Sequence, residues 1–256
     1  MAEHLVGVHA VEEWLVADPS RIEALLVEPG ATPRVMKLVD LARKAGISVR
    51  TVPGPAMAKI AGPRNSQGVA AEVKPFPYLS SEGLERIVAA ATTPLILAVD
   101  GVTDPQNLGA ILRSAAFFGV DAVVLPQDRS APISPVVERT AAGGVARVPI
   151  HQAGSFVSCI DQLKAAGLRC VVSVVGGSRP VDQAAMAGPS VLVVGSEGQG
   201  VRPSVRKLAD DRVMLASGKL DSLNVATFTG IFLYEAARQR GLGSDVAHGT
   251  QETISP

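Results

Sequence analysis

The sequence contains only two cysteines, and this scarcity excludes several kinds of site. Cys159 and Cys170 are too few and too far apart for a cysteine zinc site, so we expect both to be reduced thiols in the core. The four histidines show no metal-ligand spacing either. We therefore expect the histidines to be structural or surface residues.

Long apolar runs, aromatic residues and an excess of one charge are also missing. No apolar run approaches the roughly 20 residues of a membrane-spanning helix, and no targeting segment is evident, so we expect a cytoplasmic protein. The 24 basic and 24 acidic residues cancel, which gives no overall electrostatic case for nucleic acid. Hydrophobic residues make up 47% of the chain but aromatic residues only 4%, a balance typical of an aliphatic core of parallel strands and helices.

The pattern of helices and strands predicts an α/β fold in two parts. Residues 4–74 alternate short helix and strand patterns, which predicts a small α/β/α unit. The run KPFPYLSSEG contains two prolines and several turn-forming residues and is typical of a linker. Beyond it the alternation resumes in a longer α/β segment. The expected division is an N-terminal domain at 1–75, a linker and first helix at 76–93, a second domain at 94–241 and a flexible tail at 242–256.

Basic residues are concentrated in the N-terminal part of the chain. Residues 43–74 contain six lysines and arginines and a single acid. Within this stretch the glycine-rich loop GPRNSQG is polar and basic, which is typical of an exposed turn or of a contact to a nucleic-acid backbone. The candidate residues for such a contact are Arg64, Asn65 and Gln67.

We expect the second domain to be organised around residues 100–126, DGVTDPQNLGAILRSAAFFGVDAVVLP. An apolar strand leads into a polar turn, and the helical pattern that follows ends at Gly119 before another buried strand. Pro105 suits the first helical turn, and we expect Asn107 to cap that turn with its side-chain oxygen. The free amides of this helix N-terminus favour an anion bound at the loop.

Arg113 lies on this helix between Leu112 and Ala115, where little other charge is present. A guanidinium in such a position needs a partner or a site. Two structural alternatives are that it extends to solvent or that it pairs with a carboxylate such as Asp100 or Asp121. The functional alternative is that it serves a ligand site.

Three loops follow strands of the expected parallel sheet, and ligands bind at the carboxyl ends of such strands. They are GVTDPQN at 101–107, GSEGQG at 195–200 and SGKLDSLN at 217–224. Taken singly, each has an ordinary structural explanation. Glycine-rich turns are common and GSEGQG does not match the dinucleotide fingerprint, while Ser222 and Asn224 are typical helix caps. The conjunction of three such loops is what indicates a shared site.

The residues in these loops resemble a known family. NLGAILRSA, GSEGQGV and SLNVATFTGIFLYEA resemble, in order and spacing, the three motifs of the SpoU family of RNA ribose 2′-O-methyltransferases. GVHAVEEWL and NSQGVAAEVKP resemble the small RNA-binding domain of bacterial family members that methylate a guanosine of large-subunit ribosomal RNA. The resemblance covers nearly the whole chain before the tail.

The resemblance implies an architecture and a cofactor. Members have an α/β fold whose C-terminal part forms a deep trefoil knot, which no periodicity argument predicts. They are homodimers with the active site at the subunit interface, and they require no metal. The cofactor S-adenosylmethionine is held largely by backbone groups of the second and third motif loops, which on this chain implies Val175, Gly176, Gly195, Gly198, Met214 and Leu223.

Five positions match the family's functional residues: Asn107, Arg113, Glu197, Ser222 and Asn224. A ribose 2′-hydroxyl is a poor nucleophile until its proton is removed or its oxyanion is stabilised. Arg113 would bind the adjacent phosphate and stabilise the oxyanion, because an arginine is difficult to accept as a base. The two asparagines and the serine would fix the ribose and loop geometry, and Glu197 would orient the site by accepting hydrogen bonds.

The expected function is S-adenosylmethionine-dependent 2′-O-methylation of a guanosine in 23S ribosomal RNA. Alternatives within the class are another rRNA nucleotide, including an adenosine whose modification gives antibiotic resistance, or a tRNA. Alternatives from other classes are a catalytically silent RNA-binding protein and a nucleotide-binding enzyme that uses GSEGQG for phosphate. Intact Arg113, Glu197 and Asn224 argue against the silent protein.

Overall fold

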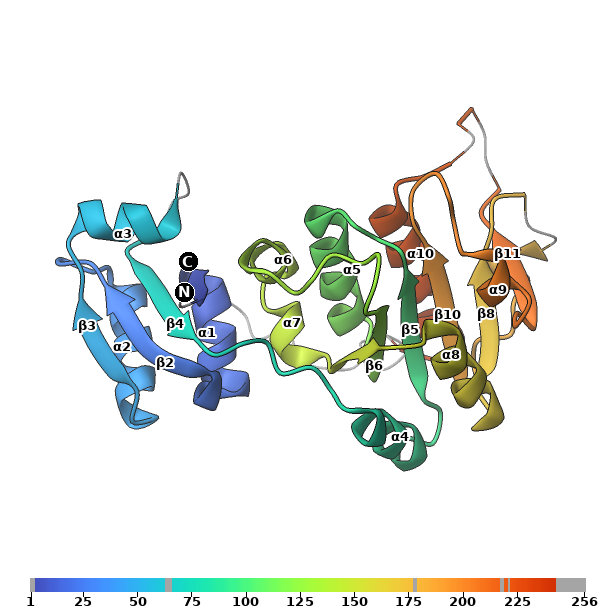
Figure 1. Ribbon diagram of the computed structural model, residues 1–256, viewed down its shortest axis with the longest axis horizontal. Coiled ribbons are helices and arrows are strands. Elements are labelled where there is room, and N and C mark those ends of the chain that lie inside the picture. The colour runs from blue at the N-terminus through green and yellow to red at the C-terminus, as the bar shows by residue number, and fades with distance from the viewer. Residues whose placement is uncertain (1–2, 63–65, 177–178, 217–218, 221, 243–256) are drawn as a thin grey trace, which may run out of the picture.

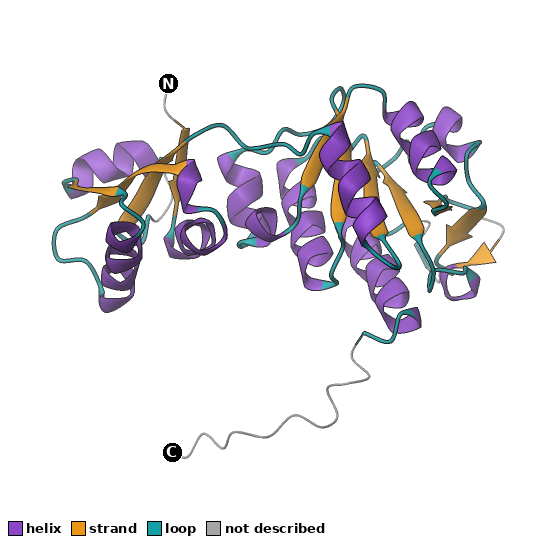
Figure 2. Cartoon of the chain, turned by 90° about the horizontal axis from the view of Figure 1, so that it is seen from below, coloured by secondary structure: helices purple, strands orange, loops and turns teal. Residues whose placement is uncertain are grey.

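The computed structural model describes residues 3–62, 66–176, 179–216, 219–220 and 222–242. The described chain folds into two sheets with helices packed against them (Figure 1). The view from below shows helices on both faces of the larger sheet (Figure 2). The predicted α/β class is therefore confirmed.

The smaller unit lies at the N-terminal end of the chain. Its strands β4 (Val69–Val73) and β2 (Ile22–Val27) pair antiparallel, and β2 pairs parallel with β3 (Ser48–Thr51). β1 (Glu3–Val6) pairs antiparallel with the other side of β4, which gives the strand order β1-β4-β2-β3. The connecting elements are α1 (Val8–Ala17), the 3-10 helix η1 (Pro19–Arg21), α2 (Pro33–Lys44) and α3 (Gly54–Ala61).

The larger unit is a parallel sheet of seven strands among the described residues, in the order β7-β6-β5-β10-β8-β11-β9. Every pairing in it is parallel. Its strands are β5 (Leu95–Asp100), β6 (Ala122–Pro126), β7 (Ile150–Ala153), β8 (Arg169–Ser173), β9 (Arg179–Pro180), β10 (Ser190–Gly195) and β11 (Asp211–Met214). The helices are α4 (Ser81–Ala90), α5 (Pro105–Phe117), α6 (Pro135–Ala141), α7 (Gly144–Arg147), α8 (Phe156–Ala165), the 3-10 helix η2 (Val181–Gln183), α9 (Pro203–Arg206) and α10 (Val225–Gln239).

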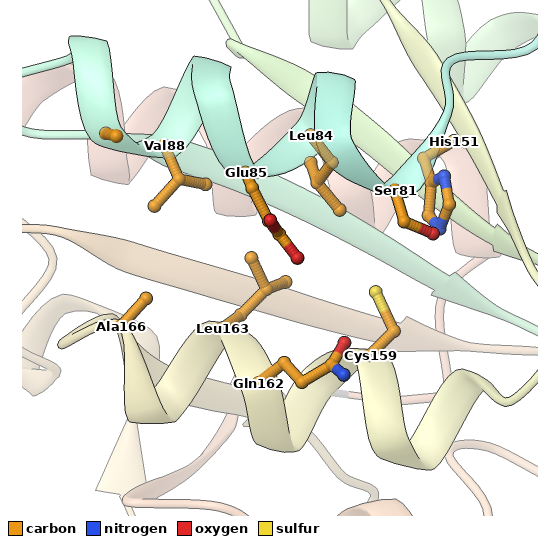
Figure 3. A pocket seen from close by; sticks show the side chains of 10 residues that line it. Ser81, Leu84, Glu85, Val88, His151, Cys159, Gln162, Leu163 and Ala166 are labelled. Atoms are coloured by element: carbon orange, nitrogen blue, oxygen red, sulfur yellow. The ribbon is translucent and has the colours of Figure 1, made fainter.

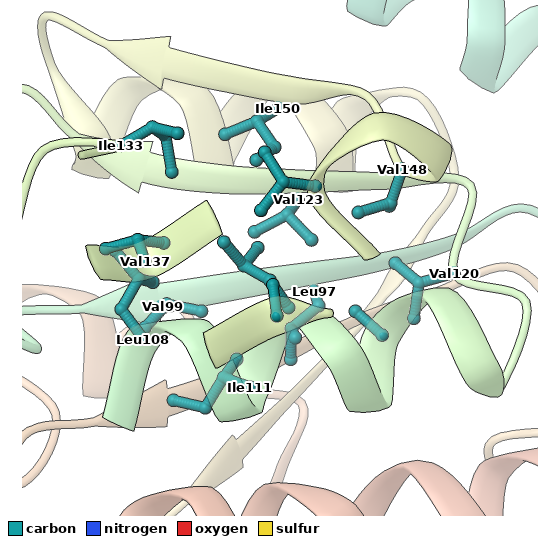
Figure 4. Packing of buried hydrophobic residues seen from close by; sticks show 14 of the residues in the cluster. Leu97, Val99, Leu108, Ile111, Val120, Val123, Ile133, Val137, Val148 and Ile150 are labelled. Atoms are coloured by element: carbon teal, nitrogen blue, oxygen red, sulfur yellow. The ribbon is translucent and has the colours of Figure 1, made fainter. Parts of the chain in front are cut away.

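The central strands are apolar on both faces because helices cover both sides of the sheet. Every residue of β5, β6 and β10 is buried. Leu97 and Val99 point to the face that packs against Leu108 and Ile111 of α5 (Figure 4). The alternate side chains of β5 join a separate cluster with α4 and α8 on the other face. This double burial explains why the strands read as continuous apolar runs.

The start of α5 differs from the expectation. Asp104 caps the helix by accepting hydrogen bonds from the backbone amides of Gln106 and Asn107, at 3.2 and 3.1 Å. The prediction that Asn107 is the cap was wrong, because the helix begins at Pro105 and Asn107 already lies inside the first turn. The other end is as expected, with Gly119 in the left-handed region at φ 70°.

Three short strands were not expected from the sequence. β1 and β7 have four residues each and β9 has two, too few to show a periodic pattern, and all three lie at the edge of their sheets. Both cysteines are free and buried, which confirms the expectation of core thiols. No helix among the described residues is long and apolar enough to cross a membrane.

The segment between the two units packs on the larger one. The Leu79 amide donates to the Ile150 carbonyl at 2.8 Å, and the Leu79 carbonyl lies 2.8 Å from Nδ1 of His151. The Tyr78 hydroxyl accepts a hydrogen bond from the Ile133 amide at 3.1 Å. Burial raises the pKa of Tyr78 above its usual value. The proline-rich run is thus held against the edge strand β7, while the domain boundaries at 75 and 93 stay predictions.

Candidate active site

The carboxyl ends of β5, β10, β8 and β11 lie at one edge of the larger sheet because these strands are parallel neighbours. The loop after β5 leads into α5, and the loop after β10 contains Glu197. The segment after β11 leads into α10, although Ser217, Gly218 and Asp221 lie outside the described residues. The predicted meeting of three loops is therefore observed between the first two loops and the end of the third.

Three side chains, one from each loop, form a hydrogen-bonded network. Asn224 donates through Nδ2 to Oε1 of Glu197 at 2.5 Å and to Oδ1 of Asn107 at 2.9 Å. Asn107 donates through Nδ2 to the same Glu197 oxygen at 3.4 Å, as does the Val225 amide at 3.3 Å. Glu197 and Asn224 are exposed, and Asn107 is partly exposed. The network therefore presents polar groups to solvent at the sheet edge.

Asn224 has two functions in this network. Its Oδ1 accepts from the amides of Ala226 and Thr227 at 3.0 and 3.2 Å, so the residue is the N-cap of α10. Its Nδ2 meanwhile holds Glu197 and Asn107. The structural interpretation as a helix cap is correct, and the position in the shared site is correct as well. Ser222 is exposed two residues earlier, and no contact between it and the network is recorded in the part of the chain that the structure describes.

The glycine-rich loop after β10 folds back tightly on itself. A Cβ on Gly195 would lie 2.0 Å from the carbonyl carbon of Gly200, so no larger residue fits there without movement of the loop. Ser196 and Gly200 form an antiparallel bridge, and Gly198 adopts a φ of 84°. The glycines are therefore required by the compact turn that presents Glu197.

An ion pair that the sequence analysis missed anchors this loop. Asp100, at the end of β5, accepts from the backbone amide of Arg202 at 2.8 Å and from its Nε at 2.7 Å. Asp100 is almost fully buried, and the Arg202 guanidinium stacks over Phe156 at 5.3 Å. Asp100 was considered only as a partner for Arg113. Its position at the last residue of a buried strand was the signal for a role at the loop.

Arg113 is not part of the network. It lies six residues after Asn107, which on a helix corresponds to about 9 Å of rise and about 240° of rotation. A Cβ on Gly144 would lie 2.9 Å from Cα of Arg113, so this side of α5 faces α7. Arg113 is exposed, and no ion pair with it is recorded among the described residues.

The carboxylates proposed as alternative partners of Arg113 are occupied. Asp100 pairs with Arg202, and Asp121 accepts from the Leu95 amide at 2.7 Å. The structure thus excludes these two pairings. It leaves an exposed guanidinium on the surface of α5, which is the state required of a group that binds a phosphate.

The expected cofactor positions lie at the same edge of the sheet as the network. Val175 and Gly176 follow β8, Gly195 ends β10 and Met214 ends β11. Gly176 has a φ of 66°, as a turn after a strand requires. Val175 is 79% exposed and Leu223 is 46% exposed. These apolar side chains beside polar backbone groups suit a ligand with an aromatic base.

The expected RNA contacts are tested only in part. Arg64 and Asn65 lie outside the described residues. Gln67 accepts a hydrogen bond through Oε1 from the Val8 amide at 3.1 Å, which holds its loop to the start of α1. Gln67 also has a φ of 53°, an unusual conformation for a residue other than glycine. Its observed contact is structural, and its role in RNA binding stays a prediction.

A separate pocket of about 260 Å³ lies between α4 and α8 (Figure 3). Cys159 and Leu163 of α8 face Leu84 and Val88 of α4 across it. Burial raises the pKa of the Cys159 thiol to about 11, so this sulfur is a poor nucleophile at neutral pH. None of the expected site residues lines this pocket. No cluster of metal-binding side chains is present in the described ranges either.

Comparison with known proteins relates this geometry to a family. Residues 94–234 match the SpoU rRNA Methylase family, and residues 4–79 match the family described as RNA 2′-O ribose methyltransferase substrate binding. The 23S rRNA (guanosine-2′-O-)-methyltransferase RlmB of Acinetobacter baylyi is 38% identical over 93% of this chain and 98% of its own. The enzyme of the same name from Vibrio parahaemolyticus is 35% identical over 93% of this chain and 97% of its own.

The fold gives the same result. The AdoMet-bound rRNA methyltransferase from Sinorhizobium meliloti has a TM-score of 0.74 and 26% identity, over 93% of this chain and 87% of that chain. The resemblance seen in the three motifs is thus supported by sequence matches over most of the chain and by a shared fold. With its motif loops gathered at one sheet edge and more than half of its length matched, this chain belongs to the SpoU rRNA Methylase family.

Proposed function

We propose that this chain is an S-adenosylmethionine-dependent RNA methyltransferase that modifies the ribose 2′-hydroxyl of a guanosine in 23S ribosomal RNA. The observation that carries the proposal is the contact of Glu197 with Asn107 and Asn224, which joins the three motif loops in one polar site. Relatives that match nearly the whole chain have this activity in their names. Action on ribosomal RNA assigns the enzyme to the cytoplasm.

Arg113 supplies positive charge for the reaction. A guanidinium stays protonated, so it acts by binding the phosphate next to the target ribose and by stabilising negative charge on the 2′-oxygen. The 2′-proton leaves to solvent or to that phosphate. Arg113 is exposed on α5 and has no recorded ion pair within the described part of the chain, which supports this role.

Glu197 and the two asparagines hold the reacting group in place. Among the described residues, the recorded hydrogen-bond donors to Glu197 are neutral amides, so a ribose hydroxyl can replace one of them without leaving a buried charge. Asn107, Asn224 and Ser222 fix the ribose and the loops around it. These residues reduce the orientational freedom that the reaction must otherwise overcome.

The residues at the sheet edge fit the cofactor. S-adenosylmethionine supplies a methyl group on a sulfonium centre, which is already an activated donor. Backbone groups at Gly195, Gly198 and Met214 would hold its polar parts, and the exposed side chains of Val175 and Leu223 would cover its base. Gly176 completes this set after β8. A Cβ at Gly195 would clash with the backbone of Gly200, which is consistent with a site built from backbone atoms.

We infer that the C-terminal part is a trefoil knot. The order of strands supports this, because β10 lies between β5 and β8 while β11 returns to the other side of β8. The last helix, α10, packs against α5, which follows the first strand of the larger sheet in the sequence. Such a path is rare among folds, so it is a strong feature to test.

We also propose that the enzyme works as a homodimer. Large apolar side chains lie exposed on α5 and α10: Phe117 is 79% exposed and Tyr234 is 57% exposed. They belong to one aromatic group, since Phe118 packs edge-on against both, with ring centroids 5.0 and 6.4 Å away. A second subunit covering this surface would bury it. The offset of Arg113 from Asn107 along α5 supports a site completed by two subunits.

The direct test is transfer of labelled methyl from S-adenosylmethionine to unmodified 23S ribosomal RNA. The product is mapped by alkaline hydrolysis, because a methylated 2′-oxygen cannot attack the neighbouring phosphate. We expect label at one guanosine, whose 3′ phosphodiester bond resists alkaline hydrolysis. Label on tRNA or on an rRNA adenosine would replace the substrate assignment. Absence of cofactor binding in calorimetry would overturn the proposed enzyme class.

Arg64, Asn65 and Gln67 are proposed to contact RNA outside the reacting ribose. The match of residues 4–79 to a substrate-binding family supports an RNA-binding role for this unit. Arg64→Ala should therefore weaken rRNA binding in a filter assay without a change in cofactor affinity. Equal binding by the variant and the parent protein would remove Arg64 from the RNA surface.

A further inference from the structure

A buried ion pair connects the smaller unit to the larger one. Arg21, at the end of η1, donates through Nη1 and Nη2 to the two carboxylate oxygens of Glu138 in α6, at 2.6 and 2.8 Å. Each of the two residues is only 3% exposed. The pair is bidentate, so it fixes direction as well as distance. It joins residues that are 117 positions apart in the sequence.

Other groups from the smaller unit and the linker complete this junction. Trp14 of α1 donates through its indole nitrogen to Glu138 at 2.8 Å. The Arg21 guanidinium stacks 4.2 Å from the Trp14 ring centroid and 5.4 Å from that of Phe76, and its Nε donates to the Lys74 carbonyl at 3.3 Å. Both charged groups are thus hydrogen-bonded on several sides, as burial requires.

The junction leads directly to the helix that carries Arg113. α6 approaches α5 so closely that a Cβ on Gly109 would lie 2.5 Å from Cβ of Thr140, two residues after Glu138. Thr140 also donates to Gln106 of α5 at 3.0 Å. α6 and α7 lie on the side of the larger sheet that faces the smaller unit (Figure 1). A fixed Glu138 therefore fixes the smaller unit relative to α5.

We propose that Arg21 and Glu138 are positioning residues that hold the substrate-binding unit in one orientation on the methyltransferase unit, so that RNA bound to the first is delivered in register to Arg113 of the second. This inference rests on the proposed function. Two binding surfaces held rigidly engage one long RNA with less loss of freedom than two surfaces on a flexible linker. A short RNA that reaches only the active site gains nothing from the pair.

The chain offers a matched control that crosses between the same two units. Glu13 of α1 pairs with Arg147 of α7 at 2.6 Å, but the Arg147 side chain is 59% exposed. Solvent competes with an exposed pair of this kind, so it contributes little to orientation. Arg147→Gln therefore removes an ion pair from the junction without disturbing the buried one.

The experiment compares steady-state methyl transfer by the parent protein, Glu138→Gln and Arg147→Gln. Each is assayed on a long 23S rRNA fragment and on a short oligonucleotide around the mapped target guanosine. For Glu138→Gln we expect the KM for the long RNA to rise about tenfold. We expect kcat, cofactor affinity and activity on the short RNA to stay within about twofold. Arg147→Gln should behave like the parent protein on both substrates.

The outcomes separate the inference from the proposed function. A parent protein that methylates neither RNA overturns the proposed function. An active parent with an unchanged KM in Glu138→Gln, or with equal losses on long and short RNA, overturns the positioning role. If Glu138→Gln is unfolded by circular dichroism, the double variant Arg21→Met/Glu138→Gln takes its place, because it buries no uncompensated charge. The same rise in KM is expected from it, since the directional contact is gone.

Discussion

Two glutamates in this protein each accept hydrogen bonds from three nitrogen atoms, yet their surroundings are opposite. Glu138 is buried at the junction of the two units and accepts from a guanidinium and an indole. Glu197 is exposed at the sheet edge and accepts from the two asparagine amides and one backbone amide. A buried carboxylate requires a permanent counter-charge, whereas an exposed one does not.

The difference indicates which of the two centres can change partners. Removing a donor from Glu138 leaves a charge in an apolar environment, so that centre holds one arrangement. Removing a neutral donor from Glu197 lets water or a substrate hydroxyl take its place at small cost. The protein thus has a rigid polar centre for orientation and an adaptable one for the reaction. Substitutions at each centre test this division.

The largest expected effect comes from Glu138→Ala. The substitution leaves the Arg21 guanidinium buried without its carboxylate, and breaking a buried pair in this way typically costs about 3–5 kcal/mol. We expect the free energy of unfolding, measured in urea, to fall by that order. Glu197→Ala is the matched substitution at the exposed centre, and it should change stability by less than about 1 kcal/mol. Equal losses from the two variants would contradict the distinction.

Arg113→Ala should have the next largest effect, and on activity only. Loss of one charged group that stabilises an oxyanion typically lowers kcat about 10²–10³-fold. Because Arg113 is exposed, the melting temperature and cofactor affinity should remain those of the parent protein. Arg113→Lys keeps the charge but loses the planar fork, so it should recover only part of the activity. Full activity of Arg113→Ala would remove this residue from the mechanism.

The sequence predicted most of the fold because the central strands and helices carry strong periodic signals. The apolar run before Asp100 and the helix that ends at Gly119 were both expected where they occur. The short edge strands β1, β7 and β9 lack such a signal and were missed. The cap of α5 was assigned to Asn107 instead of Asp104, because both residue types cap helices and only the backbone shows where the first turn begins.

The candidate site was predictable only in part for a similar reason. Motif order pointed to Asn107, Glu197 and Asn224, and the structure brings these three together. Contacts between residues far apart in sequence leave no local pattern, so the partners in the Asp100–Arg202 and Arg21–Glu138 pairs could not be predicted, although the position of Asp100 at a strand end was a signal. The side of α5 that carries Arg113 likewise depends on how α5 packs against α7.

Asn224→Ala should weaken the exposed centre moderately. The substitution removes the N-cap of α10 and the bridge between Asn107 and Glu197 together. A lost cap typically costs about 1 kcal/mol of stability, and a misplaced site residue should lower kcat by about 10–100-fold. Urea unfolding and methyl transfer measure the two effects. Asn224→Asp keeps the cap but repels Glu197, so stability with lost activity in that variant would separate the two functions of the residue.

The smallest expected effect concerns the buried thiols at alkaline pH. Burial raises the pKa of Cys159 to about 11 and that of Cys170 to about 12, from 9.0. Below pH 9 both thiols are neutral whether the chain is folded or unfolded, so their burial contributes its full stability there. As the pH rises above 9 the unfolded chain ionises first, and this stability is lost progressively toward the folded pKa values. Between pH 8 and 9.5 we expect a loss of less than about 1 kcal/mol per thiol, measured by urea unfolding. The double variant Cys159→Val/Cys170→Val has no thiol to ionise, so a slope as steep as that of the parent protein would show that other groups cause the decline.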